Sequence, residues 1–166
     1  FGAEIIKRPS DLALDQSPSE SVVRHALSEL QSREEEFDLL TLLQPTSPLR
    51  TSKHIDHGFE IILNSNCSSV ISVCELNNKI LKAFQENKYG FLEGAISNKH
   101  PFLRRQDLPR VYLPNGAIYI IKINMFNKNG NFYTDKIAKF VMSDIDSLDI
   151  DTMDDIKIAR SCIKII

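Results

Sequence analysis

The stretch LLQPTSPLR at residues 42–50 ends an apolar run that begins at Phe37. A continuous apolar run is typical of a strand that is covered on both faces of its sheet. Pro45 and Pro48 remove backbone donors and prevent a helix from continuing, so the run must stop here. In an open α/β sheet, ligands bind where such strands end. The stretch therefore predicts an α/β fold with Gln44 at the ligand-binding edge of its sheet.

The segments on either side alternate between strand and helix. Apolar spacing predicts helices over 19–32, with Ser19 or a neighbour as the cap, and from Thr51 or Ser52 onward. Apolar runs predict strands over 4–7, 38–43 and 68–74. Strand, helix, strand, helix, strand is the order of a mostly parallel sheet with right-handed crossovers, as in Rossmann-like domains.

The second half of the chain is less regular. Residues 75–114 show no helical period and are expected to form loops and short strands, with a hairpin around 87–90. Strands are predicted over 116–123 and 136–142. Thr152 and Asp155 fit a capping box that begins a final helix.

The composition suits one domain and argues against several classes of protein. The 166 residues are 42% hydrophobic, and 20 basic against 22 acidic residues give a net charge of −2. This balance gives no sign of nucleic-acid or membrane-surface binding, and no apolar run reaches the roughly 18 residues of a membrane helix. The three cysteines lack metal-ligand spacing, which fits buried thiols in a reducing cytoplasm.

The segment SLDIDT at 147–152 is the candidate metal site. Asp149 and Asp151 are two residues apart, which places both carboxylates on one face of an extended segment. Two like charges this close repel, and Mg²⁺, which takes one or two carboxylates together with substrate phosphates, would offset the repulsion. The alternative is a solvated acidic turn that leads into the helix begun by Thr152.

Other candidate positions have both a functional and an ordinary interpretation. The Gln44 amide suits a base edge or an amide-bearing sugar, although an ordinary strand-to-helix turn also fits. A cluster of arginines that includes Arg105 suits a carboxylate or phosphate. Lys82 stands among apolar neighbours and reads as a surface lysine, and Tyr119 lies within a strand, where packing in the core is its ordinary role.

The order of the motifs resembles one known family. The matching stretches are RPSDLALD (8–15), LLQPTSPLR (42–50), SVISVCE (69–75), RRQDLPRVYLPNGAIYI (104–120) and MSDIDSLDIDTMDD (142–155). Together they cover nearly the whole chain and resemble the CMP-sialic acid synthetases, or acylneuraminate cytidylyltransferases.

The resemblance implies a reaction and an architecture. The reaction joins CTP to a nine-carbon 2-keto acid sugar, giving a CMP-sugar and pyrophosphate with Mg²⁺ as the cofactor. The fold would be a Rossmann-like nucleotidyltransferase sheet, with an excursion over about 75–135 that forms a homodimer and reaches the partner's active site. Most members of the family are cytoplasmic bacterial enzymes, so a cytoplasmic location is expected.

The resemblance also implies roles for individual residues, carried over motif by motif. Arg8 and Ser19 match nucleotide-binding positions, and Asp149 and Asp151 match the metal pair. The sugar-binding positions are Gln44, Arg105 and Tyr119, with Lys82 near both sugar and phosphate. Phe132 and Tyr133 are expected at the tip of the excursion.

Two departures from the family pattern qualify these expectations. The family opens with a strand and a basic, Gly-containing loop that grips the triphosphate, and this sequence has no such stretch. The first βαβ portion is therefore expected to be absent, and the 166 residues alone are expected not to turn over CTP. NNKI (77–80) replaces the His-His-Pro type stretch of the sialic-acid members, which points to a sugar such as legionaminic or pseudaminic acid.

Two other functions remain open at this point. The chain fits a truncated, non-catalytic dimeric domain of the same fold, and it also fits a cytidylyltransferase for an eight-carbon 2-keto acid sugar. The Asp149–Asp151 pair argues against the non-catalytic reading, because such a protein gains nothing from the repulsion between the two carboxylates.

Overall fold

The computed structural model, which describes residues 2–14 and 16–163, is built on a four-stranded sheet with strand order β1-β5-β2-β6. The strands are β1 (Leu39–Leu42), β2 (Ser69–Leu76), β5 (Val111–Lys122) and β6 (Ile137–Val141).

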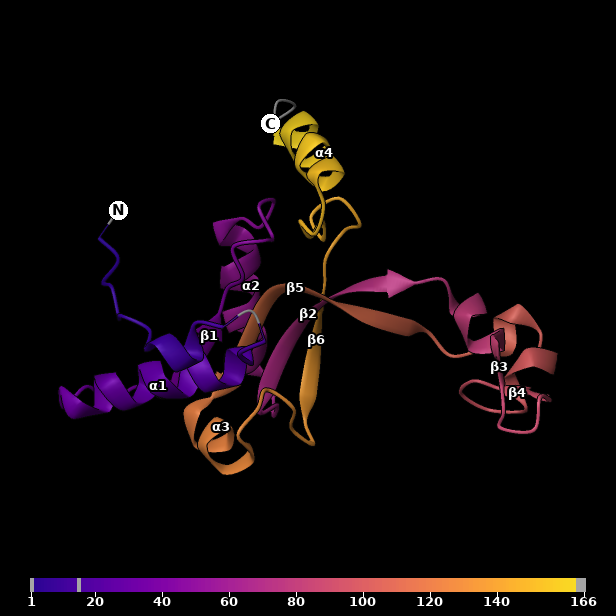
Figure 1. Cartoon of the computed structure of the whole chain (residues 1–166), viewed down its shortest axis with the longest axis horizontal. Coiled ribbons are helices and arrows are strands. Elements are labelled where there is room, and N and C mark those ends of the chain that lie inside the picture. Colours follow the sequence, from indigo (N-terminus) through magenta and orange to yellow (C-terminus); the bar gives the residue numbers. More distant parts are fainter. Residues whose placement is uncertain (1, 15, 164–166) are drawn as a thin grey trace.

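This sheet confirms the α/β class but is mixed, not mostly parallel. β5 is antiparallel to both β1 and β2, and only β2 and β6 pair in parallel. The reason lies in the connection from β2 to β5. The chain leaves the sheet after β2 and returns through β5 in the opposite direction, so that β5 separates β1 from β2 (Figure 1).

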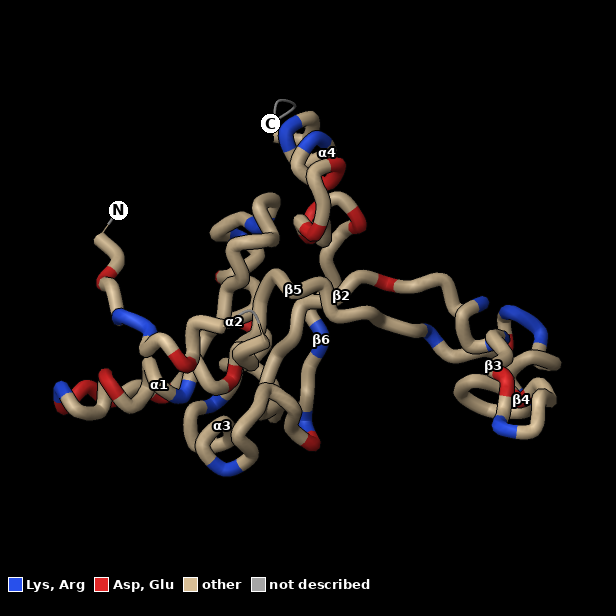
Figure 2. Tube along the Cα trace, in the orientation of Figure 1, with Lys and Arg blue, Asp and Glu red and all other residues tan. Residues whose placement is uncertain are grey.

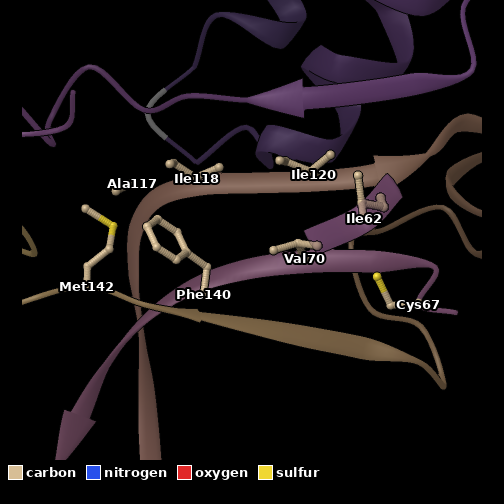
Figure 3. Close-up of a cluster of buried hydrophobic side chains, with 8 residues drawn as sticks. All are labelled: Ile62, Cys67, Val70, Ala117, Ile118, Ile120, Phe140 and Met142. Carbon is tan, nitrogen blue, oxygen red and sulfur yellow. The ribbon is translucent and has the colours of Figure 1, made fainter. Parts of the chain in front are cut away.

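Helices cover the two faces of the sheet. Side chains alternate between the faces of a strand, so successive residues of β5 enter different cores. Ile118 and Ile120 pack with Val70 of β2 and Ile62 of α2 (Ser52–Asn64), as Figure 3 shows. Ile121 packs on the other side, in a cluster with residues of α1 (Ser19–Ser32) and α3 (Ile123–Asn129). Within the described residues, no helix has the length and apolar character required to cross a membrane.

The sequence predicted the starts of three helices, and the structure confirms the predicted caps of two of them. Thr51 caps α2 in a capping box with His54, and Thr152 and Asp155 form the predicted box before α4 (Met153–Ile163). α1 begins at Ser19 but has Pro18 at its N-cap position and no side-chain cap. The fixed φ of proline, −61° here, sets the entry to this helix instead.

Residues 77–110 form a separate lobe outside the main sheet (Figure 1). It contains the hairpin of β3 (Phe84–Glu86) and β4 (Leu92–Gly94), with the expected turn closed by a hydrogen bond from the Gly90 amide to the Asn87 carbonyl. Three short 3-10 helices complete it: η2 (Asn78–Lys82), η3 (His100–Phe102) and η4 (Arg105–Asp107). The lobe is shorter than the excursion expected over 75–135, because α3 and Phe132 pack on the body of the molecule.

The strand predicted over 4–7 is wrong. This segment runs beside α1, where Glu4 pairs with Arg33 at 3.1 Å and the Lys7 carbonyl lies 3.2 Å from Nε2 of His25. Ile5 is 91% exposed. A strand needs a neighbour for its backbone groups, and two apolar residues alone do not provide one.

Candidate functional site

The candidate site begins at a bend in β5. The pairing of β2 with β5 shifts register between Ile71 and Val73, opposite the segment that contains Gly116. Gly116 has φ +75°, and Figure 3 shows the strand bending next to Ala117. Side chains of L residues avoid this conformation, so a glycine allows the strand to bend without strain.

The bend brings Gly116 against two predicted site residues. A methyl group on Gly116 would lie 2.8 Å from Oε1 of Gln44 and 3.7 Å from Oδ2 of Asp149. Gln44 follows β1 and Asp149 follows β6, so strands far apart in the sequence deliver their polar side chains to one place. This is the arrangement expected from LLQPTSPLR, and it joins that motif to the acidic segment.

Tyr119 belongs to the same cluster. Burial raises the pKa of the Tyr119 hydroxyl, and the carboxylates of Asp149 and Glu20 raise it further. Glu20 lies in the first turn of α1. Of the predicted site residues, Gln44, Tyr119 and Asp149 therefore belong to one region.

Hydrogen bonds between backbones connect the two loops of the cluster. The amide of Ile150 donates to the Thr46 carbonyl at 2.9 Å, which joins the acidic segment to the QPTSPLR loop. Nη1 of Arg50 donates to the carbonyls of Gln44 (3.0 Å) and Ala117 (2.8 Å). Arg50 thus braces the loop against the bend.

Asp149 carries an unpaired buried oxygen. Its Oδ1 is shielded from solvent and has no hydrogen-bond partner in the described part of the chain. A buried carboxylate oxygen without a donor is costly and is suited to a cation. Asp151 is exposed, and its backbone amide donates to Asp155 at 3.2 Å. Across residues 2–14 and 16–163, no three His, Cys, Asp or Glu side chains gather into a metal-binding group.

Lys82 and Arg105 lie on the lobe, away from Gln44 and Asp149 of the same chain (Figure 1). Lys82 ends η2 and Arg105 begins η4, and Asn78 joins the two helices by donating to the Arg105 carbonyl at 3.2 Å. Arg105 lines an open cavity of about 510 Å³ together with Arg110 and Glu75. One chain alone therefore does not bring these two cations to the cluster.

Of three further candidates, Phe132 has different surroundings from those expected. Phe132 is 8% exposed and packs between Tyr119 and Phe126, with ring centroids 5.5 and 5.3 Å away, so it is part of the body and not of the tip of the excursion. Tyr133 follows it and is exposed. Arg8 is exposed and donates to the Leu12 carbonyl; Asp15, in the same matched stretch, lies outside the described residues.

The sequence interpretation missed Asn115 as a site residue. Asn115 and Gly116 read as a simple turn, whereas they form the bend within a long strand. The available signal was the interruption of an apolar strand pattern by Pro-Asn-Gly, which is typical of a bulge.

The largest cavity described is elsewhere. It measures about 750 Å³ and lies between the end of α1 and the start of β1, with Phe37 and Asp38 in its lining. Gln44 is at the opposite end of β1. The position of the cluster therefore follows from the converging polar groups and not from cavity size.

The fold and the cluster define an α/β protein with a polar, acid-containing candidate site at the ends of β1 and β6 and at the bend of β5. No protein-family model matches the chain. It is 31% identical over 157 residues to an N-acylneuraminate cytidylyltransferase of Streptococcus agalactiae serotype V, covering 93% of this chain and 36% of that protein.

The chain covers a larger share of two other relatives. The post-translational flagellin modification protein B of Campylobacter coli is 30% identical over an alignment 169 positions long, gaps included, that covers 99% of this chain and 70% of that protein. The CMP-N,N'-diacetyllegionaminic acid synthase of Legionella pneumophila is 32% identical over 146 residues, 87% of this chain and 62% of that protein.

The chain belongs to the family of acylneuraminate and related nonulosonic acid cytidylyltransferases. It spans 36% of the length of the Streptococcus agalactiae relative.

Proposed function

We propose that the chain forms the sugar- and metal-binding part of a cytidylyltransferase that transfers CMP from CTP to a nine-carbon 2-keto acid sugar. The observation that carries this proposal is the buried, unpaired oxygen of Asp149 next to Gln44, at the bend of β5. Family membership supplies the reaction class, and the names of the relatives include sialic and legionaminic acid derivatives.

The reaction is a displacement at phosphorus. The anomeric hydroxyl oxygen of the sugar bonds to the α-phosphorus of CTP, the bond from that phosphorus to the oxygen bridging to the β-phosphate breaks, and pyrophosphate departs with the electron pair. The hydroxyl proton passes to water. Such a transfer depends on positioning and on neutralising charge more than on covalent help from the protein.

The residues of the cluster are assigned to positioning the sugar. The Gln44 amide donates to and accepts from acyl or hydroxyl groups of the sugar, and Tyr119 lines the pocket. Gly116 leaves room between Gln44 and Asp149 that a side chain would fill. Arg8 and Ser19 remain assigned to the nucleotide on the family resemblance of their sequence positions.

Asp149 and Asp151 are assigned to Mg²⁺. The orphaned oxygen of Asp149 fits this ion, and two carboxylates are enough because Mg²⁺ takes its remaining ligands from substrate phosphates and water. The bound ion would supply charge stabilisation at the α-phosphate and lower the pKa of the attacking hydroxyl.

A second copy of the chain is assigned to complete the site. The lobe carries seven Lys and Arg residues against three Asp and Glu, whereas residues 143–155 carry six Asp and no basic residue (Figure 2). Arg105 of the partner subunit would pair with the sugar carboxylate and Lys82 of the partner subunit would offset the repulsion between sugar and triphosphate. Exposed aromatic residues on the lobe, including Phe84, Phe91 and Phe102, support its use as a homodimer interface.

The test is binding of CMP-sugars by the chain, measured by calorimetry with Mg²⁺ and with EDTA. We expect CMP-N,N'-diacetyllegionaminic acid or CMP-N-acetylneuraminic acid to bind with Mg²⁺, and Asp149→Asn to weaken this binding at least tenfold. A control variant, Asp56→Asn, changes a helix carboxylate of α2 outside the cluster and should bind as the unchanged chain does.

Binding that is the same with EDTA and in Asp149→Asn would reject the assignment and favour a non-catalytic dimeric domain. A preference for the CMP derivative of an eight-carbon 2-keto acid sugar would replace the proposed substrate. Turnover is a separate measurement, because we retain the expectation that residues 1–166 alone release no pyrophosphate from CTP, and a pyrophosphate-release assay checks it.

A further inference from the structure

The side-chain amide of Asn115 is buried and hydrogen-bonds to several neighbouring parts of the candidate site. Asn115 is 7% exposed. Its Oδ1 accepts from Oγ of Ser72 on β2 at 2.6 Å and from the Ala117 amide at 3.2 Å. Its Nδ2 donates to Oγ of Ser147 at 2.8 Å and lies 3.4 Å from the Met142 sulfur. A carboxamide has two acceptor and two donor positions, so all four are occupied.

The surroundings allow this amide only one orientation. The Ala117 amide can only donate, so the oxygen of Asn115 must face it and the NH₂ group must face Ser147. The single proton of Ser72 goes to Asn115, and the Ser72 oxygen accepts from the Ile118 amide at 2.7 Å. Asn115 therefore joins three fixed points and has no hydrogen-bonding position left for a ligand.

Two of these points adjoin the proposed metal ligand in the chain or in space. Ala117 follows Gly116, which faces both Gln44 and Asp149. Ser147 lies in the turn that leads into Asp149. Another polar contact of this turn, from Oδ2 of Asp146 to Nε2 of His54 on α2, is longer, at 3.8 Å. The bond from Asn115 to Ser147, at 2.8 Å, thus attaches the acidic segment to the bend.

We propose that Asn115 is a positioning residue, which fixes Asp149 relative to the bend of β5 by holding Ser147, Ala117 and Ser72 at once. Its influence on ligand binding passes through Asp149, and in that respect the inference rests on the proposed function. The attachment itself is a property of the folded chain and can be measured without any ligand.

The decisive variant is Ser147→Ala, which removes the link to Asn115 and leaves the bonds to Ser72 and Ala117 intact. Hydrogen exchange by NMR reports on the acidic segment through the Ile150 amide, which bonds to the Thr46 carbonyl. We expect the protection of Ile150 to fall about five- to thirtyfold, the factor that corresponds to losing one buried hydrogen bond. Val70 in the core of β2 and Ala117 at the bend should keep their protection.

Two further variants control for the substitution itself. Ser147→Thr retains the hydroxyl and should restore the protection of Ile150. Ser161→Ala is a matched change in α4, where the hydroxyl bonds to the Ile158 carbonyl, and should leave the protection of the Ile150 amide unchanged. Unchanged protection of Ile150 in Ser147→Ala would overturn the proposal. A parallel fall at Val70 would also overturn it, because this would mean a general loss of stability.

A second measurement separates this inference from the proposed function. Mn²⁺ binding is followed by electron paramagnetic resonance. The Mn²⁺ affinity should fall in Ser147→Ala by about the same factor as the hydrogen-exchange protection of the Ile150 amide, and it should recover in Ser147→Thr. If the unchanged chain binds no Mn²⁺, the metal assignment fails while hydrogen exchange still decides the role of Asn115. If Mn²⁺ affinity is the same in all three chains although Ile150 loses protection, Asp149 is positioned by other contacts and the proposal fails.

Discussion

Gly116 lies so close to Gln44 that one added methyl group would come within 2.8 Å of the Gln44 side-chain oxygen. This contact joins the bend of β5 to the loop after β1, and it explains why the bend is made by a glycine. Both the positive φ and the close approach exclude a side chain here.

Gly116→Ala should destabilise the chain and disturb the sugar site. A left-handed conformation costs an L residue about 1–2 kcal/mol, and the added methyl would also push Gln44 aside. Gly90→Ala is the matched control, because Gly90 has φ +80° and nothing within 4 Å of an added methyl. Denaturant unfolding should show similar losses in both variants, whereas CMP-sugar binding should weaken in Gly116→Ala only. Equal binding by the two would mean that Gln44 is not part of the site.

Gln44→Ala should change the order in which the chain prefers different CMP-nonulosonic acids. The amide offers a donor and an acceptor in one plane, so acyl groups that use both lose more than sugars that use neither. Dissociation constants for the sialic, legionaminic and pseudaminic acid derivatives measure this. A uniform loss that leaves the order unchanged would assign the choice of sugar to other residues.

Asp149→Asn should lower the pKa of Tyr119 in the metal-free chain. Burial and the carboxylates of Asp149 and Glu20 hold this pKa above its ordinary value of 10.0. Tyr119 therefore stabilises the fold below pH 10, and this contribution is lost as the pH rises through its folded pKa. In Asp149→Asn this loss should be smaller and should be complete at a lower pH.

The measurement is tyrosinate absorbance, with Tyr119→Phe identifying the signal of Tyr119 among the four tyrosines. Glu20→Gln should lower the pKa by a smaller amount, since Asp149 has the larger effect of the two carboxylates. If the pKa of Tyr119 is the same in Asp149→Asn as in the unchanged chain, the two side chains do not interact.

Thr152→Ala should raise the pKa of Asp155 and weaken the start of α4. Hydrogen bonds from the Thr152 side chain and backbone hold this pKa below its ordinary value of 3.8. Asp155 therefore stabilises the helix above pH 3.8, and this contribution is lost as the pH falls through its lower folded pKa. Carbon-detected NMR of the Asp155 carboxyl measures the change, and Thr152→Ser, which keeps the hydroxyl, should titrate as the unchanged chain does. An unaltered titration in Thr152→Ala would contradict the capping box.

Substitution on the lobe should weaken a homodimer of the chain. Phe102 is 83% exposed and contacts Phe84 edge-to-face, with ring centroids 6.3 Å apart. Burying a large apolar side chain contributes about 1.5–3 kcal/mol, so Phe102→Ser should raise the dimer dissociation constant roughly ten- to hundredfold. Analytical ultracentrifugation measures it. Leu63→Ser, which changes a 71% exposed side chain on α2 of the body, is the control, and an equal effect from this variant would place the interface elsewhere.

Local patterns were enough to predict most of the elements. The bounds of α1, the cap at Thr51, the capping box at Thr152 and the apolar strands of the main sheet follow from spacing along the chain, because helix and strand periodicities and caps depend on neighbours in the sequence. The segment over 4–7 shows the limit of this reasoning, since a strand requires a partner that lies far away in the sequence.

The sequence by itself determined which residues are candidates for the chemistry of this protein. LLQPTSPLR and SLDIDT stand out because prolines end a buried strand and because two carboxylates repel each other without a cation. Only the tertiary structure decided that Gln44, Gly116 and Asp149 meet, that β5 runs against its neighbours, and that Lys82 and Arg105 lie on a separate lobe. These are contacts between residues remote in the chain. They depend on strand direction and on which distant residues the bend of β5 meets, and no local pattern encodes either.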